Sequence, residues 1–202
     1  MSSYFHNYSF IAIRGGNTVK TKILIYLILL LVLTACKNYS TDLPIEDKTN
    51  IYYNEIKNSL DKNNANNIKI IMTKKGKQKE ELILYSYYSD INKSIIMGIK
   101  SAKWNSNGVE FVDLTQQICQ PLPISFGSIL QENNNEKRMI TYGIINDNKI
   151  KSVKLIYTDK ISIEEEFNGT GFIIIRNNYF DGITQIIASN KNSNEVYKFP
   201  DK

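Results

Sequence analysis

Few residues of this chain are of the types that usually carry catalysis. Among its 202 residues are two cysteines, Cys36 and Cys119, and one histidine, His6. His6 lies within residues 1–35, which we expect to be absent from the mature chain, so the mature chain would have no imidazole to activate a nucleophile or to bind zinc or copper. We therefore expect no histidine-dependent catalysis and no histidine-bound metal. The cysteines, carboxylates and tyrosines remain as candidates, and among them we expect neither a metal site, such as one for calcium, nor a cofactor.

Cys36 ends a segment with the composition of a secretory signal. Lys20 and Lys22 supply positive charge, and an unbroken apolar run of 11 residues, Ile23–Leu33, follows them. A basic start, a short apolar run and small residues before the cleavage site are typical of such signals. The alternative, a transmembrane anchor, needs about 18 or more apolar residues, and only 14 residues separate Lys22 from Lys37.

The segment closes with Leu33, Thr34, Ala35 and Cys36, which resemble the lipobox of bacterial lipoproteins with a type II signal peptide. That resemblance implies that Leu33, Thr34 and Ala35 are read by the processing machinery. It also implies that Cys36 carries a diacylglyceryl group, is the site of palmitate-type acylation and becomes the new N-terminus. Two acyl chains give stable anchoring. We therefore expect a lipid-anchored protein on the extracytoplasmic face of the cell membrane.

Residues 1–19 are long for a region that precedes the basic start of a signal. Arg14-Gly15-Gly16 can be encoded by a purine-rich string that would serve as a ribosome-binding site, with Val19 at a suitable distance as a GTG start codon. We expect that translation starts there and that the preceding residues are untranslated. The alternative is an unusual signal with a real 19-residue extension.

Removal of residues 1–35 changes the charge of the chain. Three basic residues and no acid are lost, which leaves 167 residues with 22 basic and 20 acidic side chains and a net charge of +2. A charge this small and dispersed does not favour nucleic acid as a partner. The length suffices for one domain with a core. We expect the membrane lipid as one partner and an envelope protein or a glycan as another.

The mature chain divides into a tether and a single domain. Residues 36–48 are polar and lack apolar periodicity, which indicates a lipidated flexible tether. Residues 49–202 should form one β-rich domain that opens with a short helix. Thr49 or Asn50 can cap this helix, and Tyr52, Ile56 and Leu60 recur every four residues, which predicts one buried stripe.

After the helix the apolar period changes to two, which predicts strands. Asn105-Ser106-Asn107-Gly108 is the clearest hairpin turn, because Asn-Gly tolerates positive φ. The pattern predicts a mainly β fold, a two-sheet β-sandwich-like domain of about ten short strands. The alternative is an α+β fold with a curled antiparallel sheet and the helix across one face. The expected strands are 68–73, 81–88, 94–104, 109–115, 138–145, 150–157, 161–163, 171–176, 183–189 and 195–199.

Three further groups could carry chemistry. Glu164-Glu165-Glu166 with Asp181 is the main acidic concentration, but alternation along a strand sends Glu165 away from its neighbours, so we expect no carboxylate cage. Tyr85 and Tyr87 share one face of a strand; exposed they would stack on glycan or peptide, and buried, which we favour, they are core. Cys119 lacks a partner once Cys36 is acylated and is read as a small buried hydrophobe, with a reactive thiol as the alternative.

The C-terminal half loosely resembles uncharacterised small lipoproteins of low-GC Gram-positive bacteria. The shared features are a Tyr-Gly strand at Met139–Gly143, an Ile-x-x-Val strand after a turn, and a closing Val196-Tyr197 strand. This resemblance implies no activity. We expect a non-catalytic binding or assembly module and no catalytic residues. The alternative is a histidine-free hydrolase that uses two carboxylates on cell-wall or peptide substrates.

Overall fold

The computed structural model describes residues 45–60, 64–133, 136–178 and 181–200 of the chain. These residues form one helix and eleven strands in three antiparallel sheets. The fold is therefore mainly β and sandwich-like, which confirms the predicted class. In this part of the chain, no helix combines the length and the apolarity needed to cross a bilayer.

Helix α2 (Ile45–Ser59) packs its predicted stripe against the first sheet. Tyr52, Ile56 and Leu60 are all buried, which confirms the stripe. The helix begins at Ile45, however, and not after Thr49 or Asn50 as predicted.

Lys48 shows why the helix extends further toward the N-terminus than the periodicity suggested. Its Nζ lies 3.6 Å from a carboxylate oxygen of Glu81 and 5.4 Å from the ring centroid of Trp104. Glu46 and Asp47 in the first turn also suit the positive end of the helix dipole. Residues 45–48 thus belong to the folded domain and not to the tether. The rest of the predicted tether, residues 36–44, lies outside the described residues, as does the predicted signal segment.

The first sheet has the strand order β1-β2-β3-β4. Its strands are β1 (Ala65–Lys75), β2 (Glu80–Ser89), β3 (Ser94–Asn105) and β4 (Gly108–Ile118). The predicted Asn-Gly turn joins β3 to β4: Asn105 pairs with Gly108, whose φ of +129° is one that L side chains rarely adopt.

The middle sheet has the strand order β5-β6-β9. It consists of β5 (Ile124–Asn133), β6 (Glu136–Ile145) and β9 (Gly171–Asn177). Strand β5 was not predicted, because Pro121 and Pro123 precede it and the alternation that begins with Ile124 and Phe126 breaks at Ser128.

The third sheet has the strand order β11-β10-β7-β8. It comprises β7 (Ile150–Tyr157), β8 (Ser162–Glu166), β10 (Ile183–Asn190) and β11 (Glu195–Phe199). In β7, the alternating residues Val153, Leu155 and Tyr157 are buried, as predicted.

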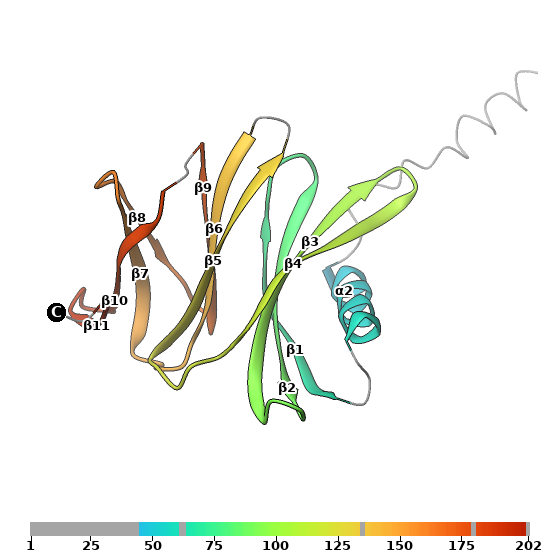
Figure 1. Ribbon diagram of the computed structural model, residues 1–202, viewed down its shortest axis with the longest axis horizontal. Helices are drawn as coiled ribbons and strands as arrows, with labels where there is room; N and C mark the ends of the chain where they lie inside the picture. The colour runs from blue at the N-terminus through green and yellow to red at the C-terminus, as the bar shows by residue number, and fades with distance from the viewer. Residues whose placement is uncertain (1–44, 61–63, 134–135, 179–180, 201–202) are drawn as a thin grey trace, which may run out of the picture. The chain divides into compact units, whose positions relative to one another are not determined.

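Helix and sheets stack as four layers, in the order α2, first sheet, middle sheet and third sheet (Figure 1). Each interface has its own apolar core. The domain therefore has three sheets and three cores where two sheets were expected. The cores include Tyr52, Ile56, Tyr85 and Trp104 under the helix, Leu84, Ile99, Tyr142 and Ile173 between the first and middle sheets, and Leu155, Phe172, Ile174 and Ile186 between the middle and third sheets.

Strand β9 is covered on both faces, as its continuous apolar run predicted. Ile173 belongs to the core on one side of the middle sheet and Ile174 to the core on the other, and both are fully buried. In its hydrogen bonding, however, β9 ends the sheet and pairs with β6 alone among the described strands. The strand is central in the stack of layers and terminal in its sheet.

Candidate functional site

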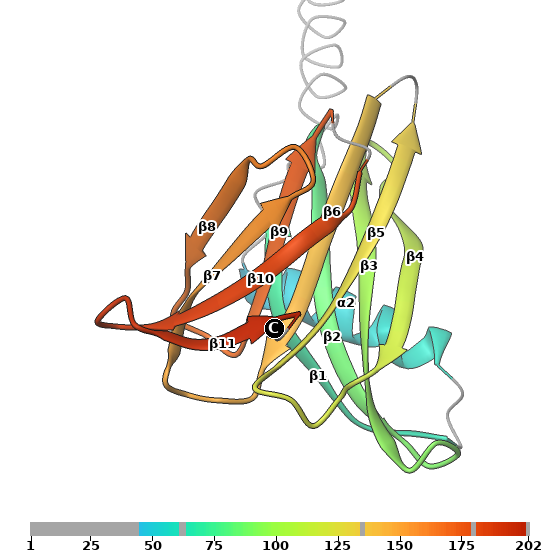
Figure 2. The same cartoon turned by 60° about the vertical axis from the view of Figure 1, so that its left-hand side comes forward.

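The interface between the first and middle sheets is closed by a side-chain contact at its β1–β9 side and contains a groove at its β4–β5 side. On the β1–β9 side, Lys74 Nζ donates to the carbonyl oxygen of Ile173 at 2.7 Å, so a side chain of β1 caps the free edge of β9. On the β4–β5 side, the strands diverge from the loop that joins them (Figure 1), and Figure 2 shows this loop at their lower ends. Near that loop, Gln117 Nε2 donates to the carbonyl oxygen of Phe126 at 2.5 Å and links the two strands.

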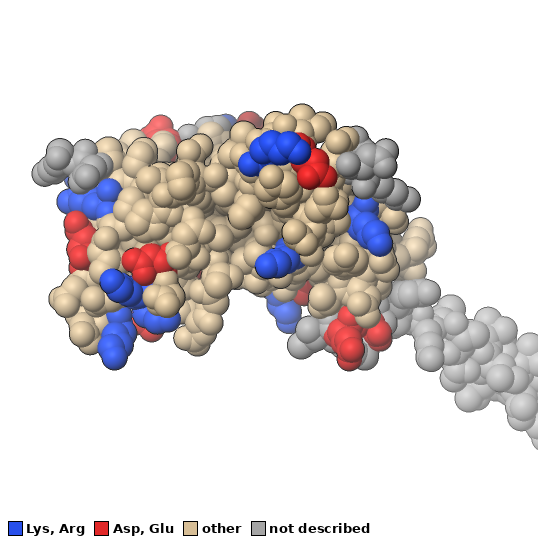
Figure 3. Space-filling model, turned by 90° about the horizontal axis from the view of Figure 1, so that it is seen from below, with Lys and Arg blue, Asp and Glu red and all other residues tan. Residues whose placement is uncertain are grey.

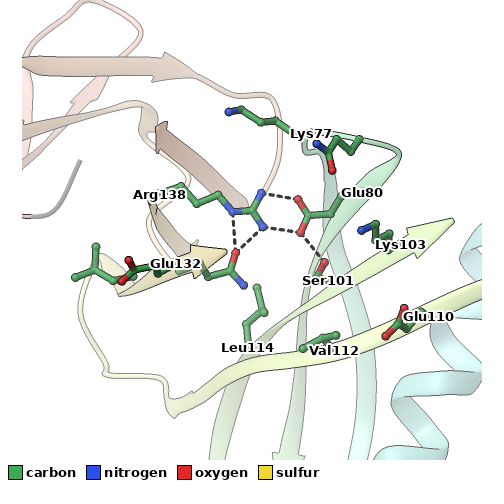
Figure 4. A pocket seen from close by; sticks show the side chains of 12 residues that line it. Lys77, Glu80, Ser101, Lys103, Glu110, Val112, Leu114, Glu132 and Arg138 are labelled. Atoms are coloured by element: carbon green, nitrogen blue, oxygen red, sulfur yellow. Dashed lines mark hydrogen bonds and ion pairs between the residues drawn. The ribbon is translucent and has the colours of Figure 1, made fainter. Parts of the chain in front are cut away.

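Away from this link the sheets enclose a groove of about 720 Å³, which we call the β4–β5 groove (Figure 4). Its floor comes from the first sheet and its opposite wall from β5 and β6, with the β1–β2 turn at the rim. Its lining residues are Lys77, Gln78, Glu80, Ser101, Lys103, Glu110, Val112, Leu114, Leu130, Gln131, Glu132 and Arg138.

An ionic network spans the inner end of the β4–β5 groove. Arg138 on β6 donates to both carboxylate oxygens of Glu80 on β2, at 2.5 Å each. It also donates through Nε to Gln131 Oε1 at 2.7 Å, and Ser101 Oγ donates to Glu80 at 2.6 Å. A bidentate arginine–carboxylate pair of this kind has defined geometry as well as strength. The network therefore joins the two sheets at a set spacing and holds the groove open at that end.

The same network determines the charge of Glu80. Burial pushes the pKa of this carboxyl upward, but the hydrogen bonds from Arg138 and Ser101, with the charges of Arg138 and Lys103, outweigh burial and hold the pKa below its usual range. Glu80 is therefore an ionised structural partner of Arg138 at neutral pH. Such a carboxylate is unsuited to donating a proton.

The open part of the β4–β5 groove exposes two aliphatic side chains within a mostly polar lining. Val112 on β4 is 50% exposed and Leu130 on β5 is 49% exposed, and both side chains line the groove, with Leu114 between them and the core. A bulge at Leu114 shifts the register of β4, between Thr115 opposite Ile99 and Asp113 opposite Lys100. Bulges of this kind re-aim side chains at sheet edges. The groove thus combines two exposed aliphatic side chains with a mostly polar lining, whose inner end is the paired network of Glu80 and Arg138.

The acidic triplet predicted from sequence is divided between two faces of β8. Glu165 pairs with Lys74, whose Nζ is 2.6 Å away, whereas Glu164 accepts a hydrogen bond from Ser152 Oγ at 2.9 Å. Asp181 is exposed in the turn before β10. Among the described residues, no group of three or more histidine, cysteine, aspartate or glutamate side chains could hold a metal ion.

Tyr85 and Tyr87 belong to the core beneath α2, as favoured above. Tyr85 is fully buried and Tyr87 half-buried, and their rings stack with centroids 6.5 Å apart. Gln116 donates to the Tyr85 hydroxyl and accepts from the Tyr87 hydroxyl, both at 2.9 Å. Burial, and after it the charge of Asp113, raises the pKa of Tyr85. The ring of Tyr85 also crosses Gly98, where a Cβ atom would lie 2.4 Å from a ring carbon.

Cys119 is half-buried and packs against the core between the first and middle sheets, and burial raises the pKa of its thiol. A raised thiol pKa disfavours the nucleophilic thiolate, which agrees with the reading as a small hydrophobe. The predicted lipidation site Cys36 and the recognition residues Leu33, Thr34 and Ala35 lie outside the described residues.

Sequence reasoning did not find the β4–β5 groove. Glu80 and Arg138 are 58 positions apart, and each occurs in a strand whose other residues give no sign of a partner. The signal in the sequence was the pair of apolar residues Val112 and Leu114, two positions apart in a predicted strand. Alternation did not indicate that Val112 would be exposed. Comparisons with known proteins add no candidate: no family model, no curated protein and no solved structure matches the chain.

Proposed function

We propose that this protein is an envelope lipoprotein, anchored to the membrane through Cys36, whose β-rich domain binds a partner without catalysing a reaction. The anchor is supported by the sequence: a basic start, a short apolar run and the lipobox-like Leu33–Cys36. The binding role is supported by the β4–β5 groove.

The observation that carries the binding role is the size and lining of this groove. Its volume of about 720 Å³ falls within the range of about 300–1,000 Å³ that is usual for ligand sites. Val112 and Leu130 expose apolar surface in it, and a ligand that covered both would gain from their burial.

The charges of the groove favour binding over catalysis. A general acid works best with a raised pKa, near the operating pH, whereas the pKa of Glu80 is lowered by Arg138. Arg138 itself is engaged by Glu80 and Gln131. On the face shown in Figure 3, basic and acidic side chains are dispersed among uncharged ones, so a partner of high net charge would meet no large surface of one sign there. An envelope protein or an uncharged glycan fits better.

One observation favours a second candidate, the histidine-free hydrolase. Glu110 on β4 and Glu132 on β5 line the same groove from different strands. Two carboxylates across a cleft are the minimum for glycosidic hydrolysis. The binding and hydrolase proposals differ in whether these two carboxylates are needed.

Site-specific photo-crosslinking in living cells tests the binding role. A photoreactive amino acid at Leu130 should give a discrete adduct with an envelope component, and the same group at Ile161 should give none. Ile161 is a matched control because it is similarly exposed, at 53%, but does not line the groove. Identical adduct patterns from the two positions would refute a partner site in the groove.

Catalysis is tested on the detergent-solubilised full chain with peptidoglycan fragments and peptides, with products followed by mass spectrometry. The expected result is no saturable turnover, and unchanged crosslinking at Leu130 when Glu110 and Glu132 are both replaced by glutamine. Saturable turnover that disappears in this double variant would replace the binding role with the hydrolase.

A further inference from the structure

The three sheets end in six strands that have a neighbour on one side only among the described residues: β1, β4, β5, β9, β8 and β11. Such edges expose backbone donors and acceptors and invite pairing with another chain, so folded proteins usually protect them. The edges of this protein differ in how well they are protected.

Most of these edges show a protective device. Lys74 of β1 donates a hydrogen bond to the backbone of β9 and forms an ion pair with Glu165 of β8. Strand β8 has five residues, three of them glutamate, and β11 has five residues and is followed by Pro200. On β5, the carbonyl oxygen of Phe126 is already engaged by Gln117.

Strand β4 has a bulge at Leu114, which also protects an edge, but the stretch before it, Gly108–Asp113, pairs with β3 in regular register. The strand is eleven residues long, and the half that borders the groove, Gly108–Leu114, contains Val109, Phe111 and Val112. These are β-branched and aromatic types that favour strand pairing. One of its two acids, Asp113, is neutralised by the buried Lys100, whose Nζ lies 2.9 Å away. Charge therefore protects this edge little.

The groove lies directly beside that edge. Glu110, Val112 and Leu114 alternate along β4 and all line the groove. A strand added to β4 would continue the alternation, so that every second side chain would enter the groove beside Val112 and Leu130.

The charges within the groove identify the side chains that fit there. Glu80 and Arg138 neutralise each other, and Glu110 stands opposite Lys103 in the β3–β4 register. Most of the lining is polar, with as many acidic as basic residues, and Val112 and Leu130 are exposed aliphatic side chains within it. A partner side chain that covers these two aliphatic groups is uncharged and apolar. Backbone pairing would supply affinity and the groove would supply selectivity, as in other cases of strand addition.

Because the free edge of β4 lies beside the groove, we propose that β4 accepts an extended segment of a partner protein as a fifth strand of the first sheet. Apolar side chains at alternate positions of this segment would lie in the β4–β5 groove. This inference rests on the proposed binding role and narrows it to one class of partner, an extended polypeptide of low net charge.

A random linear peptide library displayed on phage, selected on the detergent-solubilised full chain, provides the probe. Selected peptides should carry apolar residues at every second position. They should lose at least about tenfold in affinity, roughly 1.4 kcal/mol, when alternate backbone amides are N-methylated, because methylation removes the pairing donors. Val112→Lys should weaken binding by a similar factor, whereas Ile95→Lys, at a site 52% exposed on β3 outside the groove, should not.

Amide hydrogen exchange by mass spectrometry then locates the pairing. A bound peptide should slow exchange in 108–114 and leave 65–75 unchanged. Failure to select any peptide, peptides insensitive to N-methylation, or protection outside β4 would each overturn the strand-addition inference. Concentration-dependent protection of β4 without peptide would assign the edge to a second copy of this chain instead. If the crosslink at Leu130 persists in any of these cases, the binding role stands and only the class of partner is wrong.

Discussion

The Nζ of Lys74 lies 2.6 Å from Oε1 of Glu165 and connects strands that belong to different sheets. Because the same ammonium group also donates to the carbonyl oxygen of Ile173, one side chain of β1 in the first sheet binds β9 in the middle sheet and β8 in the third. This three-way contact closes the β1–β9 side of the domain, opposite the β4–β5 groove.

Replacement of Lys74 by methionine keeps an aliphatic stem of similar length and removes the charge. The free energy of unfolding should fall by about 1–2 kcal/mol, since hydrogen bonds to a charged group are lost while Glu165 stays half-buried. Chemical denaturation measures this change. Lys75→Met, at the exposed neighbouring position, should change stability by less than about 0.5 kcal/mol. If both variants lost the same free energy of unfolding, Lys74 would act only through the net charge of the protein and not through its contact with Glu165.

The lowered pKa of Glu80 predicts how stability depends on pH. The folded state binds a proton at this carboxyl less readily than the unfolded state, whose glutamate pKa is about 4.3. The stability that Glu80 contributes is therefore fully present above about pH 4.3 and is lost as pH falls through the lower pKa of the folded state. Glu80→Gln should cost about 1–3 kcal/mol at pH 7, because Arg138 loses its charged partner.

Denaturation midpoints measured from pH 7 to pH 3 test this dependence. Wild-type stability should fall more steeply on the acid side than that of Glu80→Gln. Ser101→Ala, which removes one hydrogen bond to Glu80, should show a smaller change in the same direction. If the denaturation midpoints of wild type and Glu80→Gln fell equally steeply below about pH 4.3, Arg138 would not stabilise the Glu80 carboxylate in the folded state.

Ile174→Ala tests the core between the middle and third sheets. Ile174 is fully buried, so the substitution should cost about 2–5 kcal/mol through lost burial and the cavity left behind. Ile95→Ala, at a strand position 52% exposed, is the control and should cost much less. Ile51, which lies outside the helix stripe, is a poorer control because it packs against the core under α2. Similar denaturation midpoints for Ile174→Ala and Ile95→Ala would contradict a close-packed core at β9.

Cys36→Ser tests the proposed anchor. The thiol would be the acceptor of the lipid, so the variant should incorporate no labelled palmitate, and unprocessed precursor should accumulate. Cys119→Ser is the matched control and should be labelled and processed like wild type. Equal labelling of wild type and Cys36→Ser would rule out the lipoprotein proposal.

The sequence alone was sufficient for the fold class, for the helix stripe and for the presence of ten of the strands, because each depends on local periodicity or on turn chemistry. Strand β8 differs in its bounds: it runs from Ser162 to Glu166, where the expected strand covered 161–163. Tyr52, Ile56 and Leu60 report a helical period wherever the helix is placed, and the Asn-Gly turn between β3 and β4 needs only the φ freedom of Gly108. The sequence also placed β9 in the interior, because Ile173 and Ile174 leave it no polar face.

The stacking of the sheets, the pairing of Lys74 with Glu165 and the groove were decided by the tertiary structure. Alternation shows that a strand has an apolar face but does not identify the sheet that covers it, so three sheets were read as two. Lys74 and Glu165 are 91 positions apart, and Glu80 and Arg138 are 58 apart. Contacts at such separations depend on how the sheets stack. Val112 and Leu130 look like ordinary core residues in the sequence, and they are exposed because the first and middle sheets diverge between β4 and β5.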